Sequence, residues 1–490
     1  MKSKLFLVLI LFSSSTGCRL GSGYEPVAIH LPPDWQNICS TTLDPSEPWI
    51  KYWEQFQDAE LNGFVDGLVS CNLDIEIAAA KVRQARAEEI KGQSNFWPQI
   101  DFVGIINRNN LSSAIPIIFD ELFSNTNFNT FYGAFNAVWN LDLFGRTQNG
   151  MLADKANIQA ARENLHVVQV SMIAEVVRAY LELKNSIDEE RLLQKSYDIE
   201  KKLLFFEGSF FENGVQDQQQ VLKRGIELDR MGSNLINKKN ETLKHLFRLE
   251  FLLDKQPNTL SYLLEKETCM PKPPTTISCG LPSDLLLKRP DIRLKEQQLI
   301  ASTYEKNVAI CNFLPEFSLF SNLGQLSNLI RTFFNQKNAN AVYGMSLLAP
   351  IFHGGELIGN LRLKTYKQKE AYFAYLKAVL EGLFDVQKSL NAFETRKLSL
   401  DFFANMTKKR GEIFELSCAL KKNALFSEKD TLLVEQSVLE STKNENQQSL
   451  QLALEFIQLN KELGAGWQYL SPEIQQLSEG EFELFKELTN

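Results

Sequence analysis

The chain has 490 residues, of which 44% are hydrophobic and 23% charged, so it can bury a sizeable core. Its formal net charge of -8 offers no basic face for nucleic acid, and no nucleic-acid partner is expected. The sequence has no phosphate-binding loop, dinucleotide fingerprint or nucleophile elbow, and its four histidines form no metal-ligand spacing, which argues against an enzyme, a cofactor and a metal site.

The first seventeen residues have the layout of a signal peptide. Lysines precede the apolar run Leu5 to Phe12, and small residues follow it. The segment Ser15-Thr16-Gly17-Cys18 resembles a bacterial lipobox, so we expect Cys18 to be lipidated and to begin the mature chain. Arg19 after this cysteine favours the outer membrane. An ordinary secretory signal followed by an incidental cysteine is the alternative.

Six further cysteines would allow disulfides in an oxidising compartment. Cys269 and Cys279 form the most plausible pair because a short loop could close between them, and scattered buried thiols are the alternative. No apolar run beyond the signal approaches eighteen residues. Any passage through a membrane must therefore be made by β-strands.

An extended segment, residues 18–57, precedes the first predicted repeat at residues 58–280. The segment Asn72-Leu73-Asp74-Ile75 predicts a helix start, and Pro98 ends that helix and opens a strand. Strands are predicted at about residues 99–108 and 130–144 from their period-two alternation. In the second strand one parity is apolar and the other mostly polar: Phe131, Gly133, Phe135, Ala137, Trp139, Leu141 and Leu143 against Thr130, Tyr132, Asn136, Asn140 and Asp142.

Gly145 permits a sharp turn, and a long helix is predicted at residues 146–211. Along it small or apolar residues recur every seventh position, at Ala153, Ala160, Val167, Ala174 and Leu181. That spacing is typical of a coiled-coil-like seam, although plain core packing gives the same pattern. The chain then reverses into a return helix at residues 218–253.

The same plan recurs at residues 281–463. A helix starts at Arg289-Pro290-Asp291-Ile292 and ends before Pro315, and the turn before the next long helix contains Gly354 and Gly355. The second copy has strands at about 316–324 and 339–352, a long helix at 356–422 and a return helix at 430–463. Residues 464–490 form a C-terminal segment.

Four strands per chain force an oligomer. Each strand has about the nine to eleven residues that a tilted membrane strand needs. Open sheet edges are not tolerated in lipid, and four strands are too few to close. Several chains must therefore combine into one barrel. Trp139 and Tyr343 could lie at the membrane interface, and packing within the sheet is the alternative.

Several segments, spread in order over nearly the whole mature chain, together resemble one family. The segments are Tyr24-Glu25-Pro26, Trp53 to Asp58 with Leu61, Asn72-Leu73-Asp74, Trp139 to Arg146, Leu281 to Leu286, Lys288 to Asp291, Pro350-Ile351-Phe352 with Gly354-Gly355, and Leu463 to Trp467. In these segments the chain resembles TolC-like outer-membrane factors, of the lipoprotein branch that serves resistance-nodulation-division efflux systems.

The resemblance implies a mainly α-helical homotrimer. Three chains would give a twelve-stranded β-barrel in the outer membrane and a helical barrel in the periplasm, with residues 464–490 in an equatorial belt. Such a trimer is a passive duct for small molecules, docked to a periplasmic adaptor and an inner-membrane pump. Outer-membrane lipid is a further partner, and the lipid on Cys18 is the only attached group expected.

The resemblance also places the periplasmic tips at the two helix reversals. Asp217, Glu428 and Asp430 are candidate gate acids, because three symmetry-related carboxylates around an axis disfavour anions. The alternative is that they cap helix N-termini. Candidate tip turns and adaptor contacts are Gly214, Val215, Ala424 and Leu425. This chain departs from the family pattern at two places. It has Leu425 where the family usually has Gly, and Leu433-Val434-Glu435-Gln436 where the family has L-D-A-Q.

Two other functions stay open at this level. One is an exit duct for type I protein secretion driven by an ATP-dependent pump. The other is a lipid-anchored coiled-coil scaffold or adhesin without a pore. The alternating strands argue against the scaffold, which has no use for lipid-facing β-structure. Surface labelling within Ala114 to Asn125 would separate the scaffold from the channel.

Overall fold

The computed structural model describes residues 19–33, 35, 50–110, 127–266, 270–275 and 288–469. The predictions for residues 1–17, Cys18, Cys269, Cys279, the segment Ala114 to Asn125, the segment Leu281 to Leu286 and most of 464–490 lie outside these ranges. The described chain forms two compact units. The first, here the strand unit, contains Met1–Ala28, Arg83–Ala160 and Lys295–Tyr375, and the second, the helical unit, contains Ile29–Val82, Ala161–Leu294 and Leu376–Asn490.

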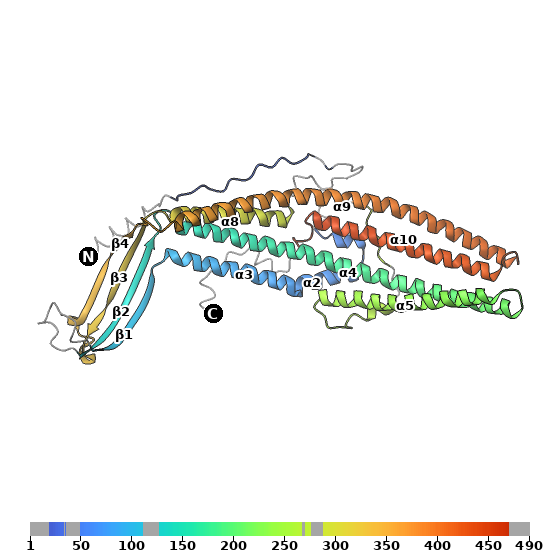
Figure 1. The fold of residues 1–490 in the computed structure, drawn as a ribbon, viewed down its shortest axis with the longest axis horizontal. Helices are drawn as coiled ribbons and strands as arrows, with labels where there is room; N and C mark the ends of the chain where they lie inside the picture. The colour runs from blue at the N-terminus through green and yellow to red at the C-terminus, as the bar shows by residue number, and fades with distance from the viewer. Residues whose placement is uncertain are drawn as a thin grey trace. The chain divides into compact units, whose positions relative to one another are not determined.

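The elements occur as two copies of one series (Figure 1). The first copy is α3 (Leu73–Gln93), β1 (Gln99–Asn110), β2 (Asn127–Leu141), α4 (Arg146–Glu212) and α5 (Gln218–Leu252). The second is α8 (Pro290–Cys311), β3 (Glu316–Ser327), β4 (Ala339–Leu348), α9 (Glu356–Lys422) and α10 (Glu428–Glu462). α4 and α9 have 67 residues each, and α5 and α10 have 35 each, so the predicted internal repeat is confirmed.

Shorter elements complete the chain, and some predicted bounds were wrong. The short elements are η1 (Tyr52–Phe56), α2 (Ala59–Cys71), η2 (Ser94–Phe96), α6 (Tyr262–Glu265), η4 (Ile330–Thr332) and η5 (Gln336–Asn338). β2 lies three residues earlier than expected, because Asp142 to Phe144 form the bend into Gly145. β4 ends at Leu348 instead of residue 352. Pro350 explains this early end, since proline lacks the N–H that a strand ladder needs.

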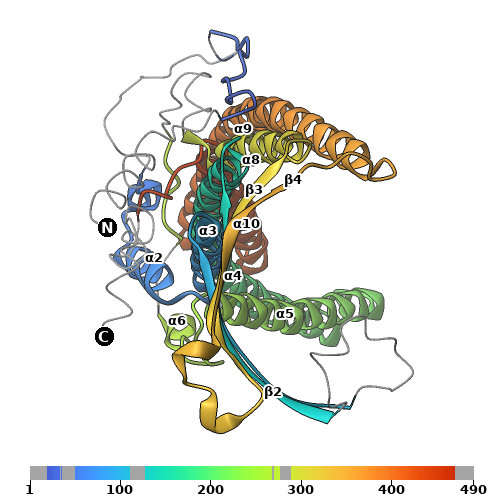
Figure 2. The same ribbon diagram turned by 90° about the vertical axis from the view of Figure 1, so that its left-hand side faces the viewer.

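In the strand unit the four strands form one antiparallel sheet in the order β1-β2-β3-β4 (Figure 1 and Figure 2). The register sorts the side chains onto two faces, because successive residues of a strand point to opposite sides. One row across the sheet is Phe102, Phe135, Leu323 and Ala341, and the row beside it is Asp101, Asn136, Asn322 and Val342. These two rows differ in polarity as predicted, but the second face also carries apolar residues such as Ile105, Val138, Phe320 and Leu326.

In the helical unit α4 pairs with α5 and α9 pairs with α10 as two antiparallel hairpins (Figure 1). The predicted seam of α4 is buried at Ala153 and Ala160 in the strand unit and at Ala174 and Leu181 in the helical unit, whereas Val167 is half-buried. Between Ile173 and Ile187 most residues of α4 are buried, and Glu175, Arg178 and Glu182 are half-buried. None of the helices in the described part of the chain has the length and apolar character needed to cross a bilayer.

The first turns of α2 and α3 are capped by side chains that accept hydrogen bonds from backbone N–H groups. Asp58 caps α2, accepting from the amides of Glu60 and Leu61. α3 is capped by Asn72, whose Oδ1 accepts from Asp74 at 2.9 Å and Ile75 at 3.1 Å. The sequence predicted a helix start in this segment, and Asn72 lies one residue before the helix, where a side-chain oxygen can reach the exposed amides.

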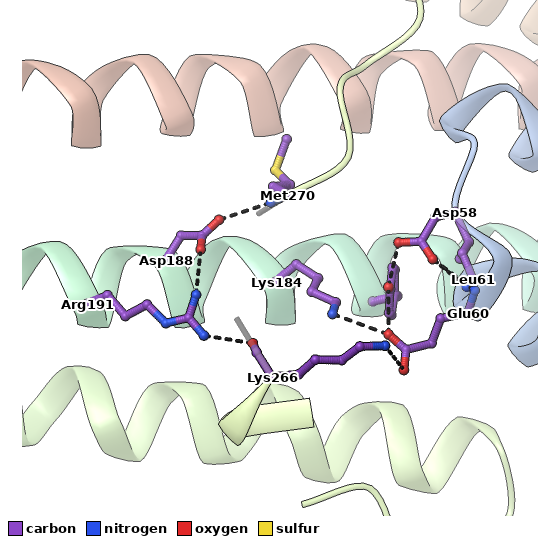
Figure 3. Close-up of polar contacts among 9 residues, drawn as sticks. Asp58, Glu60, Leu61, Lys184, Asp188, Arg191, Lys266 and Met270 are labelled. Carbon is purple, nitrogen blue, oxygen red and sulfur yellow. Dashed lines mark hydrogen bonds and ion pairs between the residues drawn. The ribbon is translucent and has the colours of Figure 1, made fainter. Parts of the chain in front are cut away.

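A polar network fastens the connecting segments to the middle of α4 (Figure 3). The Tyr180 hydroxyl donates to Asp58 at 2.6 Å, and the buried Lys184 pairs with Glu60 at 3.3 Å. Farther along α4, Asp188 accepts the Met270 amide at 3.0 Å. The hydroxyl stays a donor, because burial and these carboxylates raise the pKa of Tyr180. The network therefore ties the start of α2 and the chain near Met270 to one helix.

Candidate functional site

The two hairpin tips have the same backbone geometry. At the first tip the amide of Gly214 donates to the Phe211 carbonyl at 2.9 Å and that of Val215 to the Phe210 carbonyl at 2.8 Å. At the second tip Ala424 donates to Lys421 and Leu425 to Leu420, each at 3.0 Å. Both are Schellman endings, in which a residue of left-handed conformation closes the helix.

The left-handed residue differs between the two tips. It is Gly214 at the first tip, with φ 71°, and Ala424 at the second tip, with φ 57°. Leu425 corresponds to Val215, and the two side chains are 72% and 70% exposed. Alanine pays a steric cost at positive φ that glycine does not. The second tip therefore holds the more strained turn, and each tip presents one exposed aliphatic side chain.

The three candidate gate acids are all exposed but have different surroundings. Asp217 occupies the N-cap position of α5, yet its side chain accepts no capping hydrogen bond. Asp430 lies in the first turn of α10, where its amide donates to Ser427 Oγ at 3.0 Å and that hydroxyl donates to Asp430 Oδ2 at 2.7 Å. Glu428 pairs with Lys421 at 3.3 Å within the same hairpin. Asp430 is thus engaged in local capping, and the Asp217 carboxylate is not.

A buried polar cluster, here the tip cluster, connects the two hairpins near these turns. It consists of Glu200 and Glu207 on α4, Arg224 on α5, and Lys429 and Gln436 on α10. Lys429 Nζ lies 2.8 Å from Glu207 Oε1, and Arg224 Nη1 lies 3.0 Å from Glu200 Oε1. Gln436 Nε2 donates to Glu200 Oε2 at 3.3 Å. Both carboxylates are nearly inaccessible, so these partners replace the lost hydration of Glu200 and of Glu207 Oε1, whereas Glu207 Oε2 accepts no hydrogen bond from the described residues.

The sequence interpretation missed the tip cluster. The sequence held a signal for this cluster, because Glu200 and Glu207 are seven residues apart and therefore lie on the same face of the coiled-coil-like helix. Acidic residues on a buried helix face predict basic or hydrogen-bonding partners on a neighbouring helix. Which helix supplies them cannot be deduced from spacing alone. An apolar contact of Ile199 and Leu203 with Leu432 lies beside the cluster and joins the same helices.

The predicted strand-to-helix turns lie where elements of the strand unit meet. Pro98 and Pro315 immediately precede β1 and β3. Gly145 (φ 78°) immediately precedes α4, and Gly354 (φ 56°) and Gly355 (φ 91°) precede α9. The Trp139 indole donates to the Phe96 carbonyl at 2.8 Å, near this end of the sheet. Within the described ranges, no group of three or more His, Cys, Asp or Glu residues is placed to hold a metal ion.

Comparisons with known proteins agree with this architecture. The family model described as "Outer membrane efflux protein" matches residues 67–254 and 281–465, which are the two repeats. The pyoverdine export outer membrane protein OpmQ of Pseudomonas aeruginosa is 23% identical over 462 residues, covering 93% of this chain and 94% of its own. The probable outer membrane lipoprotein SilC of Salmonella typhimurium is 22% identical and covers 84% of this chain and 87% of its own.

Among solved structures, the CmeC outer membrane channel of Campylobacter jejuni has the same fold. It superposes with a TM-score of 0.82 at 22% identity, over 96% of this chain and 100% of that chain. Family and fold are those of channel proteins. The chain belongs to the outer membrane efflux protein family and is the outer-membrane channel component of an efflux system.

Proposed function

We propose that three copies of this chain form a passive duct that carries small molecules across the periplasm and outer membrane. The observation that supports this most is the sheet, whose edge strands β1 and β4 have no partner on their outer side among the residues that the structure describes. Its apolar face is exposed at Phe102 (65%) and Ile106 (76%). Joining three such sheets edge to edge gives a closed twelve-stranded barrel with that face toward lipid.

The duct would work with a periplasmic adaptor and an inner-membrane pump of the resistance-nodulation-division type. The helical hairpins would extend into the periplasm, and Val215 and Leu425 at their tips would contact the adaptor. Cys18 would carry the lipid anchor, in keeping with the name of SilC as a lipoprotein. Relatives are named for exporting pyoverdine and cations, so membership of the family leaves the cargo open.

The tips would form the resting gate. Asp217, Glu428 and Asp430, each present three times around the axis, would make rings that admit cations more readily than anions. The tip cluster would hold the two hairpins of each chain together in the closed state. Opening then requires the hairpins to separate, which would break the pairing of Lys429 with the buried Glu207.

The experiment that tests the duct is single-channel recording in a planar bilayer, on detergent-purified protein whose mass is verified by native mass spectrometry. A trimer with small, cation-preferring conductance is the expected result. A monomer without current would remove the pore and favour the scaffold. Cargo is tested separately in cells, where loss of the protein should raise sensitivity to small toxic compounds. Loss of protein secretion instead would favour a type I duct.

The gate acids are tested by replacing both Asp217 and Asp430 with asparagine. Removing charge from the two rings should raise the leak conductance and reduce the preference for cations. The single Asp430 variant is needed beside the double one, because the Asp430 carboxylate also accepts a hydrogen bond from the N-cap residue Ser427. Unchanged conductance and selectivity would show that the constriction lies elsewhere.

A further inference from the structure

The loop that joins β3 to β4, residues 328–338, is ordered by its own polar groups (Figure 2). The Ser327 hydroxyl donates to the Leu329 carbonyl at 2.8 Å and lies 2.8 Å from the Thr332 hydroxyl. The Asn338 side-chain amide donates to the Thr332 carbonyl at 2.7 Å. The short helices η4 and η5 form two turns of the loop. Hydrogen bonds within the loop therefore hold its shape, and its apolar side chains are not needed for that purpose.

The loop folds back over the apolar face of the sheet. A Cβ atom at Gly133 would lie 3.0 Å from the Phe333 ring and 3.5 Å from the Phe102 ring. Gly133 and Phe135 are two residues apart on β2, so they share the apolar face, where Phe135 pairs with Phe102. The missing side chain at Gly133 leaves room there for the Phe333 ring. The loop thus lies on the side of the sheet that the proposed channel turns toward lipid.

Three apolar side chains of this ordered loop are exposed. Leu329 is 44% exposed, Ile330 is 65% exposed and Phe334 is 87% exposed. Single exposed apolar residues are ordinary, but several together mark a surface that another phase or molecule covers. These three lie next to the apolar face of the sheet, because Phe333 between them packs on Gly133. We call Leu329, Ile330 and Phe334 the apolar patch.

Positive charges surround the apolar patch. Arg331 and Lys337 on the loop are exposed, and so is Arg108, which lies on the apolar face two residues beyond Ile106. None of the three forms an ion pair with a residue that the structure describes. The described residues at this end of the sheet contain no Asp or Glu: 107–110, 127–131 and 325–340. We call Arg108, Arg331 and Lys337 the rim cations.

We propose that the β3–β4 loop binds anionic lipid of the outer membrane, with the apolar patch in the acyl layer and the rim cations on lipid phosphates. Cations beside an apolar surface fit a lipid, whose phosphate and acyl chains are joined in one molecule. The loop would act as a stop that fixes the depth of the sheet in the bilayer. The proposal rests on the proposed function, in which the apolar face of the sheet meets lipid.

The charges favour lipid over a second copy of this chain as the occupant. Two such loops in contact would bring the rim cations of both copies together, which like charges oppose. Joining the sheets edge to edge would also place the end of β1 beside the start of β4 in the next copy, since both lie at this end of the sheet. Cations of two chains would then face one anion, and a lipid phosphate supplies it.

The depth of the loop is measured with Phe334→Trp in phosphatidylcholine vesicles whose acyl chains are brominated, because bromine quenches only tryptophan that it contacts. Wild type gives the background, since the chain has six tryptophans. The emission that Phe334→Trp adds should be lost in brominated vesicles and retained in unbrominated ones. Added emission that persists in brominated vesicles would overturn the proposal, whether water or a second copy covers the loop.

Ile106→Trp, on the apolar face of β1, separates this outcome from the proposed function. Its added emission should also be lost in brominated vesicles, because the apolar face meets lipid in the proposed channel. Loss at Ile106→Trp without loss at Phe334→Trp would overturn the loop alone. Emission that persists at both positions would overturn the lipid-facing sheet, and the proposed duct with it.

The rim cations are tested by native mass spectrometry of the trimer titrated with phosphatidylglycerol. The double variant Arg331→Gln with Lys337→Gln should bind about 25-fold more weakly than wild type, because each cation near an anionic lipid surface contributes about fivefold. The matched control is Lys408→Gln with Lys409→Gln, which removes the same charge from exposed positions on α9 in the helical unit. Equal affinities of the two double variants would overturn the contact with lipid phosphate.

Discussion

At the scale of single residues, Arg289 shows how one buried charge joins the two ends of the second repeat. Its guanidinium donates to both carboxylate oxygens of Asp291 in the first turn of α8, at 3.0 and 2.7 Å. It also donates to the carbonyl and the carboxylate of Glu462 at the end of α10, at 2.8 and 3.1 Å. Only arginine has enough donors in a fixed plane for this set of acceptors.

We expect Arg289→Ala to lower the free energy of unfolding by about 3 kcal/mol, because it leaves the mostly buried Glu462 carboxylate without its counterion. The control is Lys377→Ala. Its pair with Glu381 is well exposed, so the loss should stay below about 0.5 kcal/mol. Thermal unfolding followed by circular dichroism measures both. Equal losses would show that the Arg289 pair is no stronger than a surface pair.

The effect of Arg289→Ala should also depend on pH. Burial raises the pKa of Glu462 above its ordinary value of 4.5, so the folded state binds that proton more tightly than the unfolded state. The resulting stabilisation is fully present below the unfolded pKa and is lost as the pH rises through the folded pKa. Removing Arg289 raises the folded pKa further. The difference in free energy of unfolding between the variant and the wild type should therefore be smaller at about pH 5 than at about pH 8. A difference that stays constant over this range would contradict the role given to Glu462.

At the scale of elements, the two tips offer a reciprocal pair of substitutions. Ala424→Gly should stabilise the second tip by about 1 kcal/mol, since it removes the cost of a Cβ atom in left-handed conformation. Gly214→Ala should destabilise the first tip by a similar amount, because nothing lies within 4 Å of the added atom and only the backbone term acts. Amide hydrogen exchange across each reversal measures these changes. Shifts of the same sign at both tips would contradict the prediction.

The link between hairpins can be separated from pairing within one hairpin. Lys429→Gln removes the partner of Glu207 on the other hairpin, and we expect a higher leak conductance because the hairpins separate more readily. Lys421→Gln is the matched control, since it removes only the exposed pair with Glu428 inside the second hairpin. Planar-bilayer recordings compare the two. A larger leak in Lys421→Gln than in Lys429→Gln would exclude the tip cluster as the lock.

The elements themselves could be predicted, whereas their partners could not. The alternation of Phe131 to Leu141 and the glycine and proline turns placed strands and helices, because periodicity and backbone restriction act locally. The roles of Glu200 and Asn149 escaped prediction. Each is a polar residue inside a long helix, and its function depends on a segment far away in the sequence, Gln436 in one case and Leu20 in the other.

At the scale of the whole molecule, the two faces of the sheet should respond differently to charge. Ile106→Arg places a guanidinium on the exposed apolar face, and we expect it to destabilise the protein folded in the membrane by about 2 kcal/mol. Asn107→Arg is the neighbouring control, since its side chain points to the polar face. The folded trimeric fraction in lipid vesicles measures both. Equal tolerance would show that the apolar face does not meet lipid.

The polar face of the sheet has a consequence for what passes along it. In the described strands the carboxylates on this face are Asp101 and Glu316, which lie near the starts of β1 and β3. The other polar groups on this face are amides and hydroxyls, and they alternate with apolar groups; examples are Asn136, Asn140, Asn322 and Ser318. Amides hydrogen-bond water without holding ions strongly. In the proposed channel such a wall would be hydrated but would bind solutes only weakly, so molecules of different charge would pass it at similar rates.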